Sequence, residues 1–568
     1  MQKLELTWIG KDEEIRVEPR ILLNNKELDY GDTKTGNMLI HGDNLLALKA
    51  LEQDFTGRVK CIYIDPPYNT GAAFEHYDDN LEHSIWLNLM KPRLKILWNL
   101  LTSDGLLAVQ IDDNEYAHLF LMMSEICTIK KMKTICVKMS EPTGVKMASV
   151  NKTKSIPKLK EYIILAKKNG INGLELEKIP KSGWDNEYKT YCENISDTDL
   201  ERVKTILDDD NRTKEDIAYV DDIVKNIKFR NIKEVARDLG EEANEAWCFK
   251  NANRIVQFAT LTGGARDIAI KKKSSYKNLP SAFAIETSRR KMYLIRGDFN
   301  TDTQLSRCKI LFADKYLTVH PGDLWTDIKT TGLDNEGGVD FKNGKKPERL
   351  IYRIIGMSTN ENDIVLDSFL GSGTTAAVAH KMNRRYIGIE MGEHAYTHAK
   401  VRLDRVINGE DSGGVSAACN WTGGGGYKFY ELAPTLIVKD KHGNEIFSDK
   451  YNAACLAAAV AKINGFRYAP DDKTYWKQGK SDDNCYIFVT TEYLTAKKLD
   501  EIAEELSDFE HLLICAPAFD LGLNKRYGNI EIRKIPMTVL EKCEYGVDNY
   551  NLNIINPPDF DEEEFEDA

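Results

Sequence analysis

Asp65, Pro66, Pro67 and Tyr68 follow directly after the apolar stretch VKCIYI. The Asp65 carboxylate and the Pro66 carbonyl are hydrogen-bond acceptors, and proline holds the backbone torsion φ at about −65°. Such a pair of acceptors suits a reaction in which an exocyclic amine attacks an electrophile, because it binds the amine hydrogens while the nitrogen lone pair becomes available. Tyr68 adds a ring on which a nucleobase can stack. The structural alternative is a double-proline turn that only ends a strand.

A second run, SFLGSGTT, begins directly after Asp367 and contains Gly371 and Gly373. Glycines between a strand and a helix let a ligand approach the backbone, and the first turn of a helix offers free N–H groups. Glu390 follows Gly371 by nineteen residues, and an acid at about that spacing binds ribose hydroxyls in nucleotide-binding sheets. Ala376 stands where a dinucleotide fingerprint needs glycine, and no G-K-[ST] follows the loop. These features favour an adenosine-type cofactor without a pyrophosphate, with a tight turn as the alternative.

Apolar runs and helix-forming stretches alternate around both motifs. Strands are expected at 59–64 and 105–111 with a helix over about 81–101 between them, and strands again at 363–367 and 385–390 with a helix after the glycines. Strand–helix–strand alternation is typical of a parallel α/β sheet. Both motifs are therefore expected at strand ends of one sheet.

The amino-acid composition of the chain changes several times along its length. We expect a core formed by 1–127 and 331–420, a polar and lysine-rich insertion at 128–330, a glycine-rich hinge at 421–435 and a small α/β domain at 436–568. The hinge is predicted from the run of four glycines, which is typical of a flexible linker.

Composition limits the class of protein. A chain of 568 residues is too long for one core, and 42% apolar with 29% charged residues is ordinary for a globular protein. No run of eighteen apolar residues is present to span a membrane, and the first fourteen residues lack the apolar segment of a signal peptide. The eleven cysteines occur singly, which argues against a disulfide framework and favours the cytoplasm.

Charge is distributed unevenly along the chain. The net charge is −12, yet the segment 130–168 contains eleven lysines and only two acids. Lys152, Lys154 and Lys158 in this segment are candidates for contacts with DNA phosphates. The alternative is a solvated surface of the protein.

The two motifs are similar to those of a known family. FLGSG, which contains Phe369, resembles the S-adenosylmethionine loop of DNA amino-methyltransferases, and DPPY resembles their catalytic motif. Their order, with a long region between them, resembles the β class of that family. KKPERL, which contains Lys346 and Pro347, resembles the helix start that closes over the methionine end of the cofactor in that class. IHGDNL also matches a family stretch near the cofactor, where Asp43 either contacts the cofactor or only caps a helix.

A closer resemblance is to the modification subunit of type III restriction–modification systems, through IDPPYNTG, HPGDLWTDI and NIEIRKIPMTVLEKCEYG. It implies an α/β, Rossmann-like sheet of the S-adenosylmethionine-dependent methyltransferases, an inserted target-recognition region at 128–330, and a C-terminal domain that serves assembly. It also implies double-stranded DNA as substrate, a homodimer, and a helicase–nuclease restriction subunit as a possible partner.

The resemblance assigns roles to individual residues. The implied catalytic residues are Asp65, Pro66, Pro67 and Tyr68, and the implied cofactor-binding residues are Asp367, Phe369, Gly371, Gly373, Glu390, Lys346, Pro347 and Asp43. In this family aspartate or asparagine at the first motif position usually accompanies adenine and serine usually accompanies cytosine N4, so Asp65 favours adenine. A base in a duplex must be flipped out to reach such a site.

Other functions stay open at this point. A recognition and scaffold subunit that selects DNA for a nuclease–helicase is one alternative, and a free-standing adenine, cytosine-N4 or RNA methyltransferase is another. No metal is expected, because the sequence has no local His/Cys cluster and methyl transfer needs none.

Overall fold

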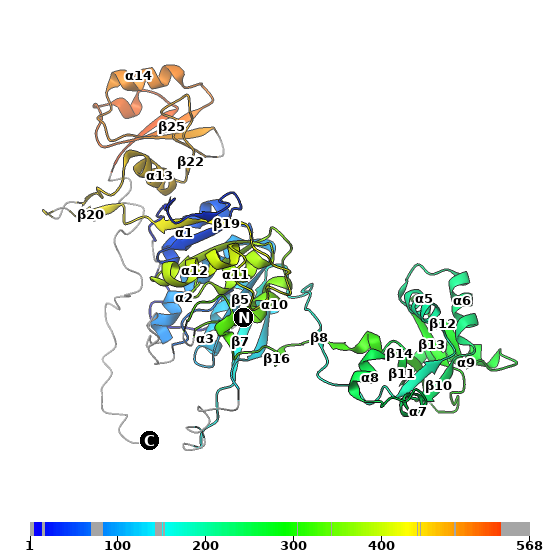
Figure 1. Cartoon of the computed structure of the whole chain (residues 1–568). Coiled ribbons are helices and arrows are strands. Elements are labelled where there is room, and N and C mark those ends of the chain that lie inside the picture. Colours follow the sequence, from blue (N-terminus) through cyan, green and yellow to red (C-terminus); the bar gives the residue numbers. More distant parts are fainter. Residues whose placement is uncertain are drawn as a thin grey trace. The chain divides into compact units, whose positions relative to one another are not determined.

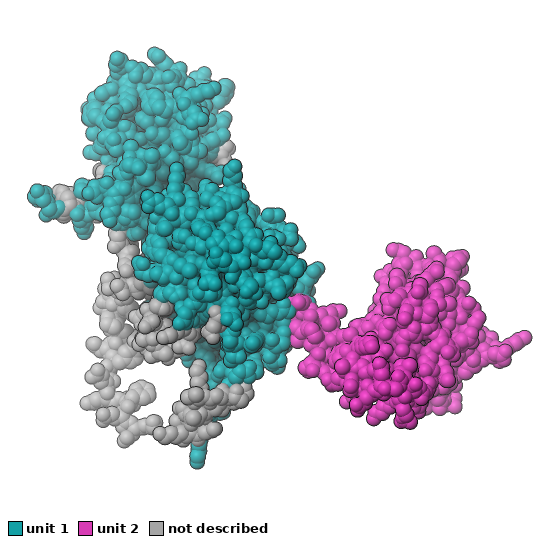
Figure 2. All heavy atoms as spheres, viewed as in Figure 1, with its two compact units in different colours: residues 1–176, 322–568 teal, residues 177–321 magenta. Residues whose placement is uncertain are grey.

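The structure is a computed structural model that describes residues 5–13, 17–69, 83–141, 150, 154–303, 305–341, 344–439, 441–442, 445–481 and 484–535. It divides into two compact units, shown in different colours in Figure 2. Unit 1 comprises residues 1–176 and 322–568, and unit 2 comprises residues 177–321. Each unit has hydrophobic clusters of its own.

Unit 1 is built on one large mixed sheet (Figure 1). In spatial order its strands are β1 (Leu22–Asn24), β19 (Gly426–Leu432), β3 (Met38–His41), β18 (Arg385–Glu390), β17 (Ile364–Asp367), β4 (Val59–Ile64), β5 (Leu101–Ile111), β7 (Lys160–Lys167), β6 (Met132–Lys138) and β16 (Leu324–Trp325), with β2 (Tyr30–Gly31) paired to β19. The strands from β19 to β5 run parallel, whereas β7 is antiparallel to both of its neighbours. The predicted parallel α/β sheet is confirmed, and β7 is an antiparallel addition that the sequence pattern does not predict.

The central strands are buried on both faces. All four residues of β17 are buried, and so is every residue of β4 except Lys60. A strand covered by helices on both faces needs apolar residues at successive positions rather than at alternate ones, and IVLD and VKCIYI largely supply them. The predicted strands 59–64 and 385–390 match β4 and β18, whereas β5 begins at Leu101, earlier than predicted.

Helices cover the large sheet on both faces and make a three-layer core. One face is covered by α1 (Asn44–Phe55), α2 (His83–Leu100) and α3 (Tyr116–Cys127), and the other by α10 (Glu348–Gly356), α11 (Thr374–Lys381), the π-helix η4 (Ala395–Lys400) and α12 (Val401–Ile407). In α2 the fully buried Trp86, Met90, Leu94 and Leu97 recur at helical spacing. Within the described ranges, no helix combines the length and the apolar composition that a membrane crossing requires.

The glycine run does not form the predicted hinge at 421–435. Gly426 begins β19, which lies inside the large sheet between β1 and β3. A Cβ atom at Gly426 would lie 2.3 Å from the Asp32 nitrogen, and one at Gly425 would lie 2.7 Å from His380 Nε2. Glycine is needed at these two positions because neighbouring atoms fill the space, so the segment is part of the core rather than a linker.

Unit 2 is narrower than the predicted insertion at 128–330, because β6, β7 and β16 belong to the large sheet. Its own sheet has the order β10 (Lys228–Asn231), β9 (Thr190–Glu193), β11 (Ile255–Thr260), β14 (Arg307–Phe312), β13 (Met292–Arg296) and β12 (Ala282–Glu286). The helices are α5 (Asp197–Asp208), α6 (Lys214–Val224), α7 (Ile232–Asp238), α8 (Glu245–Lys250) and α9 (Gly263–Ser274). A short pair, β8 (Ile179–Pro180) and β15 (Thr318–Val319), joins the two ends of the unit.

The C-terminal part of unit 1 forms the small α/β domain that the sequence predicts. Its strands are β22 (Arg467–Tyr468), β23 (Gly479–Lys480), β24 (Cys485–Val489), β25 (His511–Ala516) and β26 (Ile530–Lys534), its helices are α13 (Ala453–Ile463) and α14 (Ala496–Glu505), and a hairpin of β20 (Ile437–Lys439) and β21 (Glu445–Phe447) precedes them. The Leu436 N–H donates to the Glu18 carboxylate at 2.7 Å, and Lys462 donates to the Ala50 carbonyl of α1. The domain is therefore bonded to the core as well as connected to it through β19. The acidic tail from Asp559 lies outside the described residues.

The place of β19 leads to a prediction about truncated chains. A chain that ends at Asn420 loses Tyr427 and Phe429, both fully buried, and truncating one large aromatic in a core costs about 3–5 kcal/mol. Because a whole domain is stabilised by only about 5–15 kcal/mol, we expect this chain to be unfolded or to melt far below the full chain. A chain that ends at Ala433 keeps β19 and is expected to fold. Circular dichroism melting of both chains tests this, and equal melting temperatures would show that β19 is dispensable.

Candidate functional site

The two motifs lie side by side because β4 and β17 are neighbouring parallel strands. Ile62 of β4 is paired with Leu366 of β17, two residues before Ile64 and one before Asp367, where the strands end. The carboxyl ends of parallel strands lie at one edge of the sheet. The DPPY segment after β4 and the glycine loop after β17 therefore leave the sheet at the same edge, although about three hundred residues separate them in the sequence.

The DPPY segment is held by a helix beneath it. The indole N–H of Trp86, a fully buried residue of α2, donates to the Pro67 carbonyl at 2.7 Å. Pro66 is buried, whereas Asp65 and Tyr68 are half-buried. The segment therefore has a fixed backbone and presents two polar side chains at the edge of the sheet.

Asp65, Tyr68, Glu161 and Lys346 form one polar cluster, called the acid–lysine cluster below. The Tyr68 hydroxyl lies 2.5 Å from Asp65 Oδ1 and 2.9 Å from Glu161 Oε2. The Lys346 ammonium donates to the Tyr68 oxygen at 2.8 Å and lies 3.2 Å from a carboxylate oxygen of Asp65 and 3.2 Å from one of Glu161. The structure thus brings Lys346, which is predicted to bind cofactor, into direct contact with the predicted catalytic Asp65, and it adds Glu161, an acid of β7, as a second partner of Lys346.

Burial and charge act in opposite directions in this cluster. Burial raises the pKa of Asp65 above its ordinary value, and the Lys346 ammonium opposes this only in part. Burial also acts to raise the pKa of Glu161, but the Lys346 charge and the hydrogen bonds from Gln110 and Tyr68 outweigh it, so that pKa is lowered. Burial acts to lower the pKa of Lys346, and the charges of Asp65 and Glu161 outweigh it and raise that pKa. These pKa shifts favour the charged forms of Glu161 and Lys346 and the neutral form of Asp65.

Two uncharged side chains, Gln110 and Tyr63, hold Glu161 in place. The Gln110 amide of β5 donates to Glu161 Oε2 at 2.5 Å, and its own oxygen accepts a hydrogen bond from the Tyr63 hydroxyl at 2.6 Å. Gln110 is fully buried and Tyr63 nearly so. A buried carboxylate needs donors of this kind to remain ionised, so the arrangement keeps Glu161 charged and in place.

A second polar cluster holds the residue that follows Tyr68. The fully buried Glu115 carboxylate accepts from the Asn69 amide at 2.8 Å, and it lies 2.5 Å from His83 Nδ1 and 2.9 Å from His118 Nδ1. The sequence shows no local His/Cys cluster, but folding brings three potential metal ligands, His83, Glu115 and His118, within 4.8 Å of one another. The hydrogen bonds account for their approach, and they fasten Asn69 to the starts of α2 and α3.

The glycine loop after β17 is fixed by Asp367. The buried Asp367 carboxylate accepts from the Phe369 N–H at 2.9 Å and from the Thr375 hydroxyl at 2.6 Å. Burial raises the pKa of Asp367 to about 7, against these hydrogen bonds. Both of its oxygens accept hydrogen bonds from groups that follow β17, so Asp367 shapes the loop, and its contact with the cofactor stays a prediction.

Glu390 and the loop glycines come together as the spacing predicts. The Gly371 N–H donates to Glu390 Oε2 at 2.7 Å, and the Gly392 N–H donates to the other oxygen at 3.1 Å. Gly371 and Gly373 have φ of +53° and +81°, in the left-handed region that favours glycine. A Cβ atom at Gly373 would lie 3.0 Å from the Ala399 backbone, whereas one at Gly371 would meet only the Phe341 ring, at 3.7 Å. The Gly371 side of the loop is thus the less crowded one.

Asp43 caps a helix, which was the alternative stated for it. Its carboxylate accepts from the Leu46 N–H at 2.9 Å as the N-cap of α1. The next residue, Asn44, donates to the Ser368 carbonyl at 2.8 Å. IHGDNL therefore supports the loop that begins after Asp367, and the contact to that loop runs through Asn44 rather than Asp43.

The segment that carries Lys346 and Pro347 is fixed by a buried ion cluster. Pro347 is the N-cap of α10, and the next residue, Glu348, lies within 2.9 Å of the Lys381 ammonium and 2.8 Å of the Arg402 guanidinium. All three charged side chains are fully buried. Burial acts to raise the pKa of Glu348, but the two cations outweigh it and lower that pKa. Because an ionised carboxylate in a core must keep its partners, the start of α10, and with it Lys346, has little freedom to move.

The lysine candidates for DNA contact differ in their surroundings. Lys152 lies outside the described residues, Lys154 is exposed, and Lys158 forms an ion pair with the buried Asp112 at the end of β5. The Lys158 ammonium also lies 5.9 Å from the centre of the Tyr68 ring. The lysine-rich run therefore reaches the edge of the acid–lysine cluster.

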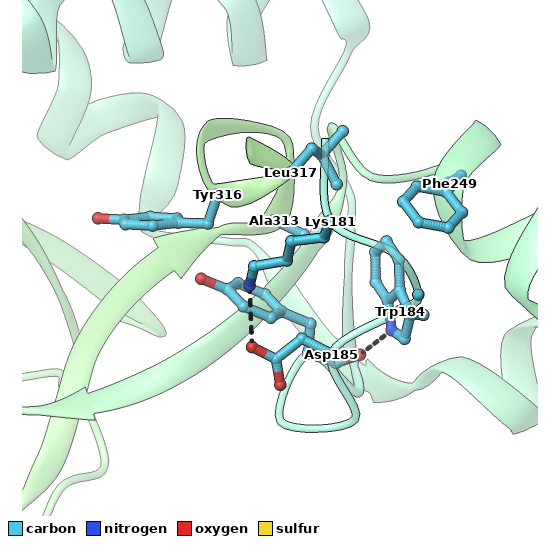
Figure 3. Close-up of a pocket in the computed structure, with 9 residues that line it drawn as sticks. Lys181, Trp184, Asp185, Phe249, Ala313, Tyr316 and Leu317 are labelled. Carbon is cyan, nitrogen blue, oxygen red and sulfur yellow. Dashed lines mark hydrogen bonds and ion pairs between the residues drawn. The ribbon is translucent and has the colours of Figure 1, made fainter. Parts of the chain in front are cut away.

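Unit 2 has a small aromatic pocket of its own (Figure 3). Trp184 and Phe249 meet edge to face with their ring centres 5.4 Å apart, and the Trp184 indole donates to the Tyr188 carbonyl at 3.0 Å. Lys181 pairs with Asp185 at 3.2 Å beside these rings. All of the lining residues belong to unit 2, so this pocket shares no residue with the two motifs.

Comparison with known families agrees with the geometry. Residues 59–401, a span of more than half the chain that includes both motifs, match the family model described as DNA methylase. The chain belongs to the DNA methylase family.

The methylase is similar to two curated modification subunits. It is 37% identical over 412 residues to the "Probable type III restriction-modification enzyme HindVI Mod subunit" of Haemophilus influenzae. The matched region covers 71% of this chain and 54% of that protein. It is 26% identical over 461 residues to the "Type III restriction-modification enzyme EcoPI Mod subunit" of Escherichia phage P1, which covers 72% of this chain and 64% of that protein. The chain therefore spans between half and two thirds of the length of these relatives. Among solved structures, a complex of M1.HpyAVI with SAM aligns with 65% of this chain and 99% of that chain, at 14% identity and a TM-score of 0.29.

Glu161 and Gln110 of the methylase are site residues that the sequence motifs do not reveal. Glu161 is one of only two acids in the lysine-rich segment, which directs attention to the lysines instead. A signal for it exists only in the pairing of β5 with β7, where Ile111 lies opposite Tyr162. Because β7 is antiparallel to β5, that register brings the start of β7, and Glu161 with it, to the same edge of the sheet as Tyr68.

Proposed function

We propose that the methylase transfers a methyl group from S-adenosylmethionine to the exocyclic amine of adenine in double-stranded DNA. The observation that carries this proposal is the side-by-side arrangement of the DPPY segment and the glycine loop at one edge of the sheet. Membership of the DNA methylase family supports the same reaction class. The residue types indicate what each segment binds. The DPPY segment after β4 would accept the hydrogens of an amine, and the glycine loop after β17 would bind an adenosine group.

The donor groups around the glycine loop fit S-adenosylmethionine. Glu390 offers a buried carboxylate for ribose hydroxyls. The backbone at Gly371 has free space on the side of the Phe341 ring, and the buried Phe369 precedes it by two residues. Lys346 and Pro347 lie at the start of α10, where the resemblance implies that they close over the methionine end. Bound here, S-adenosylmethionine would supply a methyl group: its bond to sulfur would break as the bond to the amine nitrogen forms, the thioether S-adenosylhomocysteine would leave, and the nitrogen would lose one proton to solvent.

The DPPY residues bind and orient the amine in this proposal. The amine lone pair of adenine is delocalised into the ring, so acceptors that hold its hydrogens help the nitrogen to pyramidalise. Asp65 and the Pro66 carbonyl are those acceptors, and Pro67 keeps the backbone rigid through its bond to Trp86. Flipping the base costs a few kcal/mol of unstacking, and stacking on an aromatic ring returns about 1–3 kcal/mol per base. Tyr68 is the ring for this purpose, although its hydroxyl is engaged by Asp65 and Glu161.

The biological setting is inferred from the relatives. Since two type III Mod subunits are similar to most of this chain, we infer that the methylase is the modification subunit of such a system, with adenine as target because Asp65 leads the motif. In this view unit 2 is the target-recognition region, the C-terminal domain serves assembly as a homodimer, and a helicase–nuclease subunit is the further partner. A scaffold that only selects DNA for that partner is the alternative, and methylation by the chain alone excludes it.

The first prediction concerns cofactor binding. We expect Gly371→Val and Glu390→Ala each to raise the Kd for S-adenosylmethionine at least tenfold, equal to about 1.4 kcal/mol. Valine is strained at the positive φ of Gly371 and fills the open side of the loop, and alanine removes the carboxylate that binds the loop and the ribose. Isothermal titration calorimetry measures both. Gly522→Val is the matched control, because that glycine also has a positive φ but lies in the C-terminal domain with no atom close to its Cβ position. Unchanged affinity in both variants would place the cofactor elsewhere.

The second prediction concerns methyl transfer. Asp65→Ala is expected to abolish transfer of labelled methyl groups to unmodified genomic DNA while S-adenosylmethionine still binds. An acceptor that acts mainly in the transition state affects kcat more than affinity. The readout is incorporation of label, followed by nucleoside analysis to identify the methylated base. Turnover of the variant at the wild-type rate would rule out Asp65 as the acceptor, and N4-methylcytosine in the product would correct the target.

The third prediction concerns DNA phosphates. Replacing Lys152, Lys154 and Lys158 together by methionine should reduce the slope of log binding constant against log salt by at most about three units, since each phosphate contact contributes about 0.9. Sequence preference should be kept, because phosphate contacts carry no base information. Fluorescence anisotropy with DNA at several salt concentrations measures the slope. An unchanged slope would show that these lysines do not contact DNA phosphates and only form a solvated surface of the protein.

A further inference from the structure

Asp65 lies between a fixed cation and a fixed anion. The Lys346 ammonium contacts Asp65 Oδ2 at 3.2 Å and Glu161 Oε2 at the same distance, so it bridges the two carboxylates. Glu161 is connected to Asp65 through Lys346 and through the Tyr68 hydroxyl. A change of charge at Lys346 therefore acts on Asp65 directly, and a change of charge at Glu161 acts on it across one intervening group.

The Tyr68 hydroxyl has one proton to share between two carboxylates. It lies 2.5 Å from Asp65 and 2.9 Å from Glu161, and it accepts from Lys346 at 2.8 Å. A single hydroxyl donates one hydrogen bond, so it serves whichever carboxylate carries the greater negative charge. The four groups thus form one charge-coupled system rather than independent pairs.

Other ionisable groups also lie near Asp65. Tyr63 of β4 is buried and bonded to the neutral Gln110, and burial raises its pKa well above the ordinary value. Lys158 is paired with Asp112. Asp367 of β17 is hydrogen-bonded within its own loop, and burial together with the charge of Asp65 raises its pKa to about 7. Because Asp367 is unchanged in the variants described below, its contribution is common to all of them. Among the described residues, Lys346 contacts Asp65 directly, and Glu161 is connected to it through Lys346 or through Tyr68.

We propose that Glu161 and Lys346 act together as positioning residues that set whether Asp65 is ionised, with Glu161 opposing and Lys346 favouring its negative charge. This rests on the proposed function, in which Asp65 accepts the hydrogens of the target amine. The ionised carboxylate accepts through both oxygens, whereas a protonated Asp65 would keep one acceptor oxygen and would turn a donor toward the base. The pair thereby determines the lowest pH at which the methylase works.

Glu161 has a second effect that follows from the same contacts. The Lys346 ammonium occupies an acceptor of Asp65, and the amine of an incoming base needs that acceptor. When the amine displaces Lys346 from Asp65, the ammonium keeps a buried anionic partner in Glu161. A lysine left without such a partner in this half-buried place would oppose the displacement, because an unpaired buried charge is costly.

The experiment uses the pH dependence of kcat in the full chain. At saturating S-adenosylmethionine and unmodified genomic DNA, the rate falls on the acid side as Asp65 takes up a proton. Glu161→Gln removes a negative charge, makes Asp65 easier to ionise and should move this acid limb to lower pH. Lys346→Met removes a positive charge and should move the acid limb to higher pH. A neighbouring charge shifts a carboxyl pKa by about 1–3 units at hydrogen-bond distance, so we expect shifts of about one pH unit in opposite directions.

Conservative variants separate charge from packing. Glu161→Asp and Lys346→Arg keep their charges and should leave the acid limb near its wild-type position even where the rate itself falls. Glu52→Gln and Lys49→Met remove charges from a surface ion pair of α1 and should leave the profile unchanged. Glutamine at 161 can keep the bonds to Tyr68 and Gln110, and circular dichroism verifies folding. If its rate is too low for a profile, the upward shift in Lys346→Met, absent in Lys346→Arg, tests the same coupling.

The outcomes distinguish this proposal from the proposed function. Opposite shifts of the acid limb, restored by the charge-conserving variants, support the coupling. Shifts in the same direction, or none, overturn it while leaving methyl transfer and the role of Asp65 intact, provided that Asp65→Ala is inactive. If the wild-type chain transfers no methyl group to any DNA, or if Asp65→Ala transfers it normally, the proposed function itself fails.

Discussion

The pairing of β4 with β17 is the interaction on which the site depends. Leu366 lies beside Ile62 in a parallel ladder, in the middle of a sheet that is covered by helices on both faces. A parallel ladder aligns the carboxyl ends of its strands, and a shift by one residue would move every side chain to the opposite face of the sheet, away from its packing partners. The register of these two strands thus fixes both where the DPPY segment lies and where the glycine loop begins. Unit 2 is inserted between them in the sequence without disturbing that register.

Charge buried near this edge gives the site its electrostatic character. Glu348 is held by Lys381 and Arg402 on one side of the Lys346 segment, and Asp65 and Glu161 lie on the other side. Burial of an ion pair is a poor source of stability, so these groups are better understood as a means of fixing positions and charges. Lys346 joins the two groups of charges, and any movement of α10 is transmitted directly to Asp65.

Much of the fold and part of the site could be predicted from the sequence. The boundaries of β4 and β18 follow from short apolar runs, and the acid nineteen residues after Gly371 does meet the glycine loop. Glu161 could not be predicted, because its place depends on an antiparallel pairing between segments about fifty residues apart. The glycines before β19 were misleading for a physical reason: a residue without a side chain serves tight packing as well as flexibility, and the sequence alone does not say which. Lys346 is predicted to bind the cofactor, and the structure adds a contact with Asp65 that the motifs do not indicate.

The order of the strands has a consequence for synthesis of the chain. Strand β3 is buried between β18 and β19, and both partners lie more than three hundred residues later in the sequence. At about 5–20 residues per second, a ribosome needs roughly 20–70 s to make the chain between β3 and β18. During that time β3 has neither of its two partner strands. The methylase core is therefore a structure of high contact order that cannot close until its last third has emerged, and the early half of the chain must be kept from associating with other chains until then.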